Sequence, residues 1–122
     1  MSKELRITDC IEHILSAIDR IKRHIAGVEL HQFLSSELIQ DAVIRNLEVI
    51  GEAANNIQRF DPVFATKYSE IPWQVMYAMR NRLSHGYEKV DNEMVWNTVC
   101  NDLPALKVKL KNISLNQYGS QV

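Results

Sequence analysis

The residues of this chain that could do chemistry are concentrated in one stretch, from Arg80 to Tyr87. The stretch carries two guanidinium groups, an imidazole, an amide, a hydroxyl and a phenol, on Arg80, Arg82, His85, Asn81, Ser84 and Tyr87. An imidazole can accept or donate a proton at cellular pH, and a guanidinium offers a planar set of donors that matches two phosphate oxygens. Side chains of these types could transfer protons and bind an anionic group such as a phosphate.

The spacing of Arg80 and His85 restricts the backbone conformations in which their side chains can meet. In an unbroken helix, residues five apart point about 140° away from each other. The two side chains can therefore converge within one chain only if the helix ends or tightens before His85, and Gly86 is placed to end it in a left-handed cap. Tyr87, seven residues after Arg80, would share its face if the turn persisted. The alternative is a plain polar helix end, with Arg82 and His85 complementing the helix dipole.

The elements that must position this stretch are helices, because apolar residues recur at spacings of three and four. We expect helices at 9–26, 29–34, from Ser35 or Ser36 to before Pro62, at 62–68, from Pro72 to Gly86, and from Asp91 or Asn92 to Ile113. Thr8 or Asp9 is the expected first N-cap, and Pro104 should bring a kink or a restart capped by Asp102. The fold class predicted is all-α, an up-and-down four-helix bundle with short extra helical turns, in one domain of 122 residues whose segments 1–7 and 114–122 are frayed.

Composition excludes several classes of function. Fourteen Lys and Arg against fifteen Asp and Glu give a net charge of -1, so the chain does not coat nucleic acid by bulk charge. Its longest apolar run, 75–79, is far shorter than the roughly 20 residues needed to cross a bilayer, and its N-terminus lacks an apolar signal segment, so we expect a cytoplasmic protein. The other histidines, His13, His24 and His31, have no partner at metal-ligand spacing, which argues against a zinc site.

A second charged pattern lies upstream, where Asp41, Arg45, Glu48 and Glu52 follow one another at helical spacing. One interpretation is a solvated helix face with pairs at i,i+3 and i,i+4. The other places Glu48 or Glu52 against Arg80 near a dimer interface, where the carboxylate would orient the guanidinium. In that arrangement Gly51, which lies between the two glutamates, would allow the helices to approach closely.

Two segments together resemble the HepT group of the HEPN superfamily. The first is 40–54, and the second comprises Ile71-Pro72-Trp73, 79–87, Val90-Asp91, Val95-Trp96 and Asp102-Leu103-Pro104. The resemblance implies an all-helical homodimer in which the Arg-x4-His-x-Tyr segments of both subunits meet in a cleft. It also implies a metal-independent endoribonuclease that cleaves RNA, with tRNA as a candidate, as the toxin of a type VII toxin-antitoxin pair. The antitoxin would be a nucleotidyltransferase that silences the toxin by AMPylation of Tyr87.

The resemblance assigns catalysis to Arg80 and His85. By their chemistry, Asn81 and Ser84 are expected to orient the phosphate or the histidine, and Glu52 is the supporting residue expected beside Arg80. His85 would act as the base on the ribose hydroxyl, a second His85 across the dimer axis is a candidate acid, and Arg80 would stabilise the phosphorane. Glu88 and Lys89 depart from the aromatic residue and glycine that follow the motif tyrosine in many members of the group. Two other functions fit the same fold: a non-catalytic subunit of a nucleotidyltransferase that binds a nucleotide or the partner, and a plain helical adaptor.

Overall fold

The structure of the protein, a computed structural model, describes residues 2–85 and 90–117, with side chains described as far as Ile113. All regular structure in these ranges is helical, which confirms the all-α class. In chain order the helices are α1 (Lys3–His24), α2 (Leu30–Leu34), α3 (Glu37–Phe60), α4 (Pro62–Lys67), α5 (Trp73–His85), α6 (Asn92–Asn97), the π-helix η1 (Thr98–Asp102) and α7 (Leu103–Gln117). No described helix is long and apolar enough to cross a membrane.

Helix α1 begins six residues earlier than predicted, so the expected N-cap is wrong, and residues 3–7, which were expected to be frayed, are helical. The hydroxyl of Ser2 accepts the backbone N–H of Leu5 at 3.2 Å and caps the helix. The hydroxyl of Thr8, a predicted cap, instead donates to the carbonyl of Glu4 at 2.9 Å within the helix. Ile7 is 1% exposed, so the apolar stripe of α1 starts a turn before the residues on which the prediction rested. Burial of Ile7 therefore orders the first turns.

The next three helices begin at residues whose side chains cap them, and Ser36 and Asp61 are predicted caps. Glu29 and Gln32 form a capping box at α2, the Ser36 hydroxyl accepts the N–H of Ile39 at α3, and the Asp61 carboxylate accepts the N–H of Phe64 at α4. Each cap satisfies an N–H group that the first helical turn leaves without a partner.

The last long helical stretch passes Pro104 without interruption. Proline has no N–H to donate to the carbonyl four residues earlier, and its ring crowds that carbonyl. The chain widens here into the π-helix η1, in which the N–H of Leu103 reaches the carbonyl of Thr98. Asp102 therefore lies inside a continuous helical stretch, and the predicted restart with Asp102 as cap is wrong. The backbone remains helical to Gln117, so fraying from residue 114 is also wrong as far as 117, while residues 118–122 lie outside the described residues.

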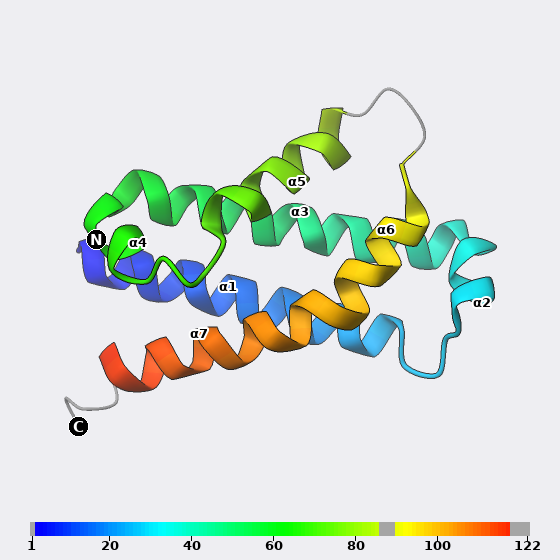
Figure 1. The fold of residues 1–122 in the computed structure, drawn as a ribbon, viewed down its shortest axis with the longest axis horizontal. Helices are drawn as coiled ribbons and strands as arrows, with labels where there is room; N and C mark the ends of the chain where they lie inside the picture. The colour runs from blue at the N-terminus through cyan, green and yellow to red at the C-terminus, as the bar shows by residue number, and fades with distance from the viewer. Residues whose placement is uncertain (1, 86–89, 118–122) are drawn as a thin grey trace.

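Packing centres on α3, which lies between α1 and α5 (Figure 1). Helices α1 and α3 contribute most of the buried apolar side chains, and α7 closes the core along α1 with Leu103, Leu106, Leu110 and Ile113. Helix α5 diverges from α6, η1 and α7, and an apolar groove of about 490 Å³ lies between them, lined in part by Met76, Met79, Met94 and Leu106. The described helices thus follow the predicted order, while the closed four-helix bundle and the homodimer stay predictions.

Candidate active site

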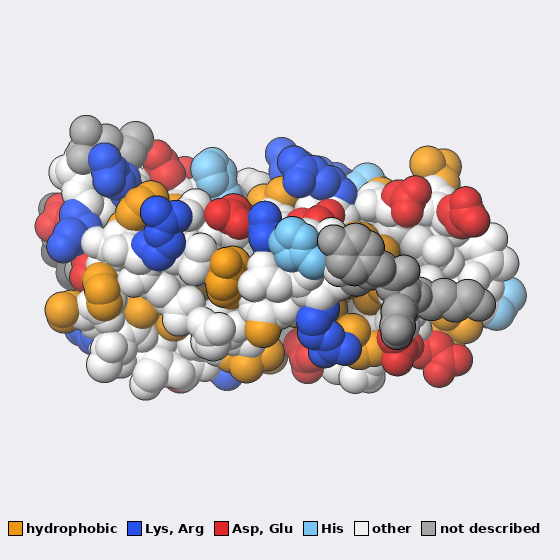
Figure 2. Space-filling model, turned by 90° about the horizontal axis from the view of Figure 1, so that it is seen from above, with side chains coloured by type: hydrophobic (Ala, Val, Ile, Leu, Met, Phe, Trp, Pro, Cys, Tyr) orange, Lys and Arg blue, Asp and Glu red, His pale blue; other side chains and the backbone are white. Residues whose placement is uncertain are grey.

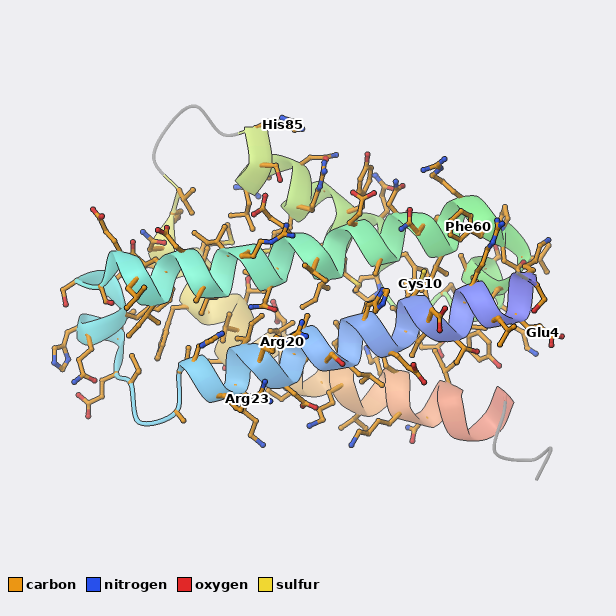
Figure 3. All side chains as sticks on the ribbon, turned by 180° about the vertical axis from the view of Figure 1, so that it is seen from behind. Glu4, Cys10, Arg20, Arg23, Phe60 and His85 are labelled. Carbon is orange, nitrogen blue, oxygen red and sulfur yellow. The ribbon has the colours of Figure 1, made fainter. Side chains whose placement is uncertain are left out.

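Helix α5 carries the predicted catalytic residues and runs without a break from Trp73 to His85. The condition for convergence within one chain, a helix that ends or tightens before His85, is therefore not met. Because Arg80 and His85 lie five residues apart on one regular helix, their side chains point about 140° away from each other. Figure 3 shows His85 at the end of α5, and its side chain is exposed. One chain by itself does not bring Arg80 and His85 to the same point.

Four residues of the predicted loop, 86–89, lie outside the described residues. The left-handed cap at Gly86, the position of Tyr87 and the effect of Glu88 and Lys89 stay predictions. The described part of the motif is the helical part, from Arg80 to His85.

Arg80 is held in place by two partners. Its Nε lies 3.3 Å from Oε2 of Glu52, and its Nη1 donates to Oδ1 of Asn81 at 2.9 Å. Of the two glutamates that could face Arg80, the structure therefore selects Glu52, and it places Asn81 on the same guanidinium. The Arg80 side chain is 29% exposed and that of Glu52 is 46% exposed, so the ion pair adds little to stability. Its effect is on the direction in which the guanidinium points.

Ser84 and Glu48 form a second link between the same two helices. The Ser84 hydroxyl donates to Oε2 of Glu48. Glu48 and Glu52 are one turn apart on α3, as are Ser84 and Arg80 on α5, so each carboxylate meets one polar group of the opposite helix. The charged pattern on α3 is therefore more than a solvated face. Asn81 and Ser84 act on Arg80 and on the helix contact, and neither has a described contact with His85.

Gly51 explains how α3 and α5 come this close. It is buried, and a Cβ at this position would lie 2.3 Å from Cβ of Arg80 and 2.7 Å from the carbonyl oxygen of Met76. Both distances are too short for any real contact. The absence of a side chain at Gly51 therefore lets α5 approach α3, which confirms the predicted role of this glycine.

A polar hollow of about 240 Å³ opens beside Arg80, between α1, α3 and α5. Its lining residues are His13, Arg45, Glu48, Val49, Glu52, Ala53, Asn56 and Arg80. Figure 2, which views the molecule from above, shows basic, acidic and histidine side chains together on this face. Sequence reasoning considered His13 only as a metal ligand and missed its place beside Arg80. No pattern along the sequence indicates this place, because it depends on how α1 packs against α3.

Among the described residues, no group of three or more His, Cys, Asp or Glu side chains is arranged to hold a metal ion. The chemistry that the described site offers is that of guanidinium, imidazole, amide and carboxylate groups. A guanidinium oriented by a carboxylate next to a polar hollow is an arrangement suited to binding a phosphate.

Comparison with known proteins decides the family. The family described as "Ribonuclease HepT-like" matches residues 14–113 of the chain. The chain belongs to the HepT-like ribonuclease family. A relative from Thermococcus cleftensis with the name "Probable ribonuclease HepT" is 40% identical to this HepT-like chain over 105 residues, which are 86% of the chain and 93% of the relative.

Two further relatives are named as RNases. One, from Caldanaerobacter subterraneus subsp. tengcongensis, is 31% identical over 103 residues, or 84% of the HepT-like chain and 89% of the relative. The other, from Methanocaldococcus jannaschii, is 41% identical over 96 residues, or 79% and 74% of the two chains. No solved structure matches the chain. The HepT-like protein is therefore a ribonuclease, and its predicted family is confirmed.

Proposed function

We propose that this ribonuclease cleaves RNA as a homodimer, with Arg80 of one subunit and His85 of the other acting on the same phosphodiester. The observation that carries the proposal is the regular helix from Trp73 to His85. It directs the two side chains of one chain apart, by about 140°, so a second copy is the simplest source of the missing group. The homodimer implied by the HepT resemblance supplies that copy.

The apolar side of α5 supports the same proposal. Val75 is 67% exposed, and Met76 and Met79 are only partly buried, beside the groove of about 490 Å³. An apolar helix face without full cover is typical of a surface that binds another protein. Pairing of two subunits along α5 would cover it and bring the two motif segments together. In that dimer each subunit would present α1, α3, α5 and α6–α7 as an up-and-down four-helix bundle.

The chemistry proposed needs no metal. His85 accepts the proton of the ribose 2′-hydroxyl, and the 2′-oxygen bonds to phosphorus. The bond from phosphorus to the 5′-oxygen breaks as water donates a proton to that oxygen. The products are a 2′,3′-cyclic phosphate and a 5′-hydroxyl. Arg80 stabilises the negative charge on the phosphorane. Nε of Arg80 faces Glu52, and Nη1 donates to Asn81. Nη2 has no hydrogen-bond partner among the described residues and is available to the phosphate.

The experiment that tests this proposal is incubation of the purified protein with single-stranded RNA and with tRNA in EDTA. We expect cleavage products that end in 2′,3′-cyclic phosphate and a loss of about 10²-fold or more in rate for His85→Ala and for Arg80→Ala. Arg59→Ala, on an exposed residue of α3 outside the hollow, is the control and should keep the wild-type rate. Cleavage that requires a divalent metal, or that survives both substitutions, would contradict the proposal.

We also propose that the protein is the toxin of a type VII toxin-antitoxin pair, silenced by a nucleotidyltransferase that transfers AMP to Tyr87. Tyr87 lies outside the described residues, and the support is chemical. An AMP group two residues from His85 would add a bulky anion that repels an RNA phosphate and takes its place. Incubation with the partner and ATP should add one AMP to the wild type and none to Tyr87→Phe, and should abolish cleavage only in the former. Unmodified but inhibited wild type would contradict this mode of silencing.

A further inference from the structure

The hollow beside Arg80 holds donors that neither the family resemblance nor the relatives' names assign. His13 comes from α1, Arg45 and Asn56 come from α3, and all three line the hollow with Arg80. His13 lies just outside the residues that the family description matches, 14–113. These groups are therefore not part of the motif on which the proposed catalytic site rests.

Some of the charged side chains that line the hollow already have partners on α5. The other side chains are available to bind a ligand. Glu52 lies against Arg80, and Glu48 accepts the Ser84 hydroxyl. Arg45 has no ion pair within the described ranges, although Asp41 and Glu48 lie one helical turn from it on either side. The imidazole of His13 likewise has no hydrogen bond to another described residue. The two carboxylates are engaged with α5, and the free donors are Arg45, His13 and Asn56.

We propose that His13 and Arg45 bind an RNA phosphate next to the one that is cut. This inference rests on the proposed function, since it places a neighbouring phosphate of the same RNA strand in the hollow that Arg80 borders. A guanidinium binds phosphate oxygens through its planar donors, and an imidazole N–H adds a donor from the opposite wall. An RNA strand is the ligand that presents a second phosphate at a fixed distance from the first. Contacts of this kind set the register of the strand without reading its bases.

The test is a binding titration at several salt concentrations with single-stranded RNA that carries 2′-O-methyl groups throughout, so that no cleavage occurs. We expect Arg45→Gln and His13→Gln each to weaken binding about fivefold to tenfold, independently of base sequence. Loss of one phosphate contact should also lower the slope of log affinity against log salt by about 0.7 in Arg45→Gln. Arg45→Lys keeps the charge and should keep the slope.

Matched controls lie on the same helices. Arg59→Gln on α3 and His24→Gln on α1 remove the same side-chain types from exposed positions outside the hollow, and both should bind like the wild type. Arg45 and His13 are exposed, so their substitutions should not change the melting temperature, and a far-UV circular dichroism melt checks this.

The outcomes separate this inference from the proposed function. If the wild type binds and cleaves RNA while Arg45→Gln and His13→Gln keep its affinity and its salt slope, the phosphate subsite is wrong and the ribonuclease mechanism stands. If these variants bind RNA normally but lose their response to the antitoxin, the hollow binds the partner protein, and the subsite is again wrong. A wild type that binds and cleaves no RNA contradicts both.

Discussion

Helices α1 and α5 pack against opposite sides of α3 and differ sharply in what they bury. Helix α1 has 22 residues, of which seven are buried: Ile7, Cys10, Ile11, Ile14, Ala17, Ile18 and Ile21. Helix α5 has 13 residues and buries only Trp73, yet it carries every described residue of the motif. Burial of apolar side chains is the main source of folding free energy. Helices α1 and α3 therefore supply most of the folding stability, while α5 presents polar side chains at the surface.

Truncation of a core residue is the strongest way to test this contrast. Ile14, in the middle of α1, is 0% exposed, so Ile14→Ala should lower the free energy of unfolding by about 2–5 kcal/mol. Met79 on α5 is only partly buried, and Met79→Ala should cost no more than about 1.5 kcal/mol in the monomer. Urea denaturation measures both. Equal losses would show that α5 is as much a part of the core as α1.

The contact between α3 and α5 is the next largest target. Gly51→Ala places a methyl group where Arg80 and the backbone of Met76 now lie, so the helices must move apart. We expect a loss of about 1–3 kcal/mol in unfolding free energy, together with a loss of RNA cleavage because Arg80 is displaced. Asp41→Ala, at an exposed position of the same helix, is the control. A stable and fully active Gly51→Ala protein would show that the close approach of the helices is not required.

A substitution at Glu52 separates orientation from stability. Glu52→Gln keeps the shape of the side chain but removes the charge that faces Nε of Arg80. Because the pair is partly exposed, unfolding free energy should change by less than about 1 kcal/mol. Cleavage should fall about tenfold, as is typical when a residue that orients a functional group is lost. Glu12→Gln, exposed on α1, should change neither quantity, and an unchanged cleavage rate in Glu52→Gln would show that Arg80 needs no such support.

Sequence patterns predicted some helix starts correctly and one wrongly, for a physical reason. Ser36 and Asp61 cap their helices as expected because a cap depends on a few neighbouring residues. The same rule failed at α1, where Thr8 and Asp9 are acceptable caps but burial of Ile7 favours an earlier start at Ser2. Local chemistry alone does not rank competing caps when tertiary packing decides between them.

In the site too, contacts related to spacing along the sequence were easier to predict than contacts set by tertiary packing. Helical spacing and Gly51 raised the possibility that Glu48 or Glu52 faces Arg80, and the packing of α3 on α5 selects Glu52. The approach of His13 from α1 depends on how α1 crosses α3, which no spacing along the sequence encodes. The helix predicted from Pro72 to Gly86 is present as α5 as far as His85, the last described residue before the gap, because its end depends on the residues next to it in the sequence.

The smallest expected effect concerns the contact between α1 and α7. Lys107 Nζ donates to Oδ1 of Asp19 at 2.8 Å, and this hydrogen bond, with the charges of Lys107, Lys111 and Arg23, holds the pKa of Asp19 below its ordinary value of 3.8. A carboxylate whose pKa is lowered on folding stabilises the folded state at pH values above its ordinary pKa. This stabilisation disappears as the pH falls through the pKa of the folded state.

Urea denaturation at neutral and at acidic pH tests this contact. Lys107→Gln should therefore be slightly less stable than the wild type at pH 7, and the difference should vanish below the folded pKa of Asp19. Lys111→Gln, whose charge acts on Asp19 more weakly, should show a smaller difference. A destabilisation that is the same at both pH values would exclude Asp19 as its source.

In the proposed homodimer, two subunits build one cleavage site from the exposed motif of α5. The most direct test uses co-expressed chains with two different tags, one carrying Arg80→Gln and the other His85→Gln, so that purification on both tags yields only mixed dimers. Each parent homodimer should be inactive. The mixed dimer retains one Arg80 and one His85 on different chains, and we predict that it cleaves RNA roughly tenfold or more faster than either parent. A mixed dimer as inactive as its parents would contradict the account.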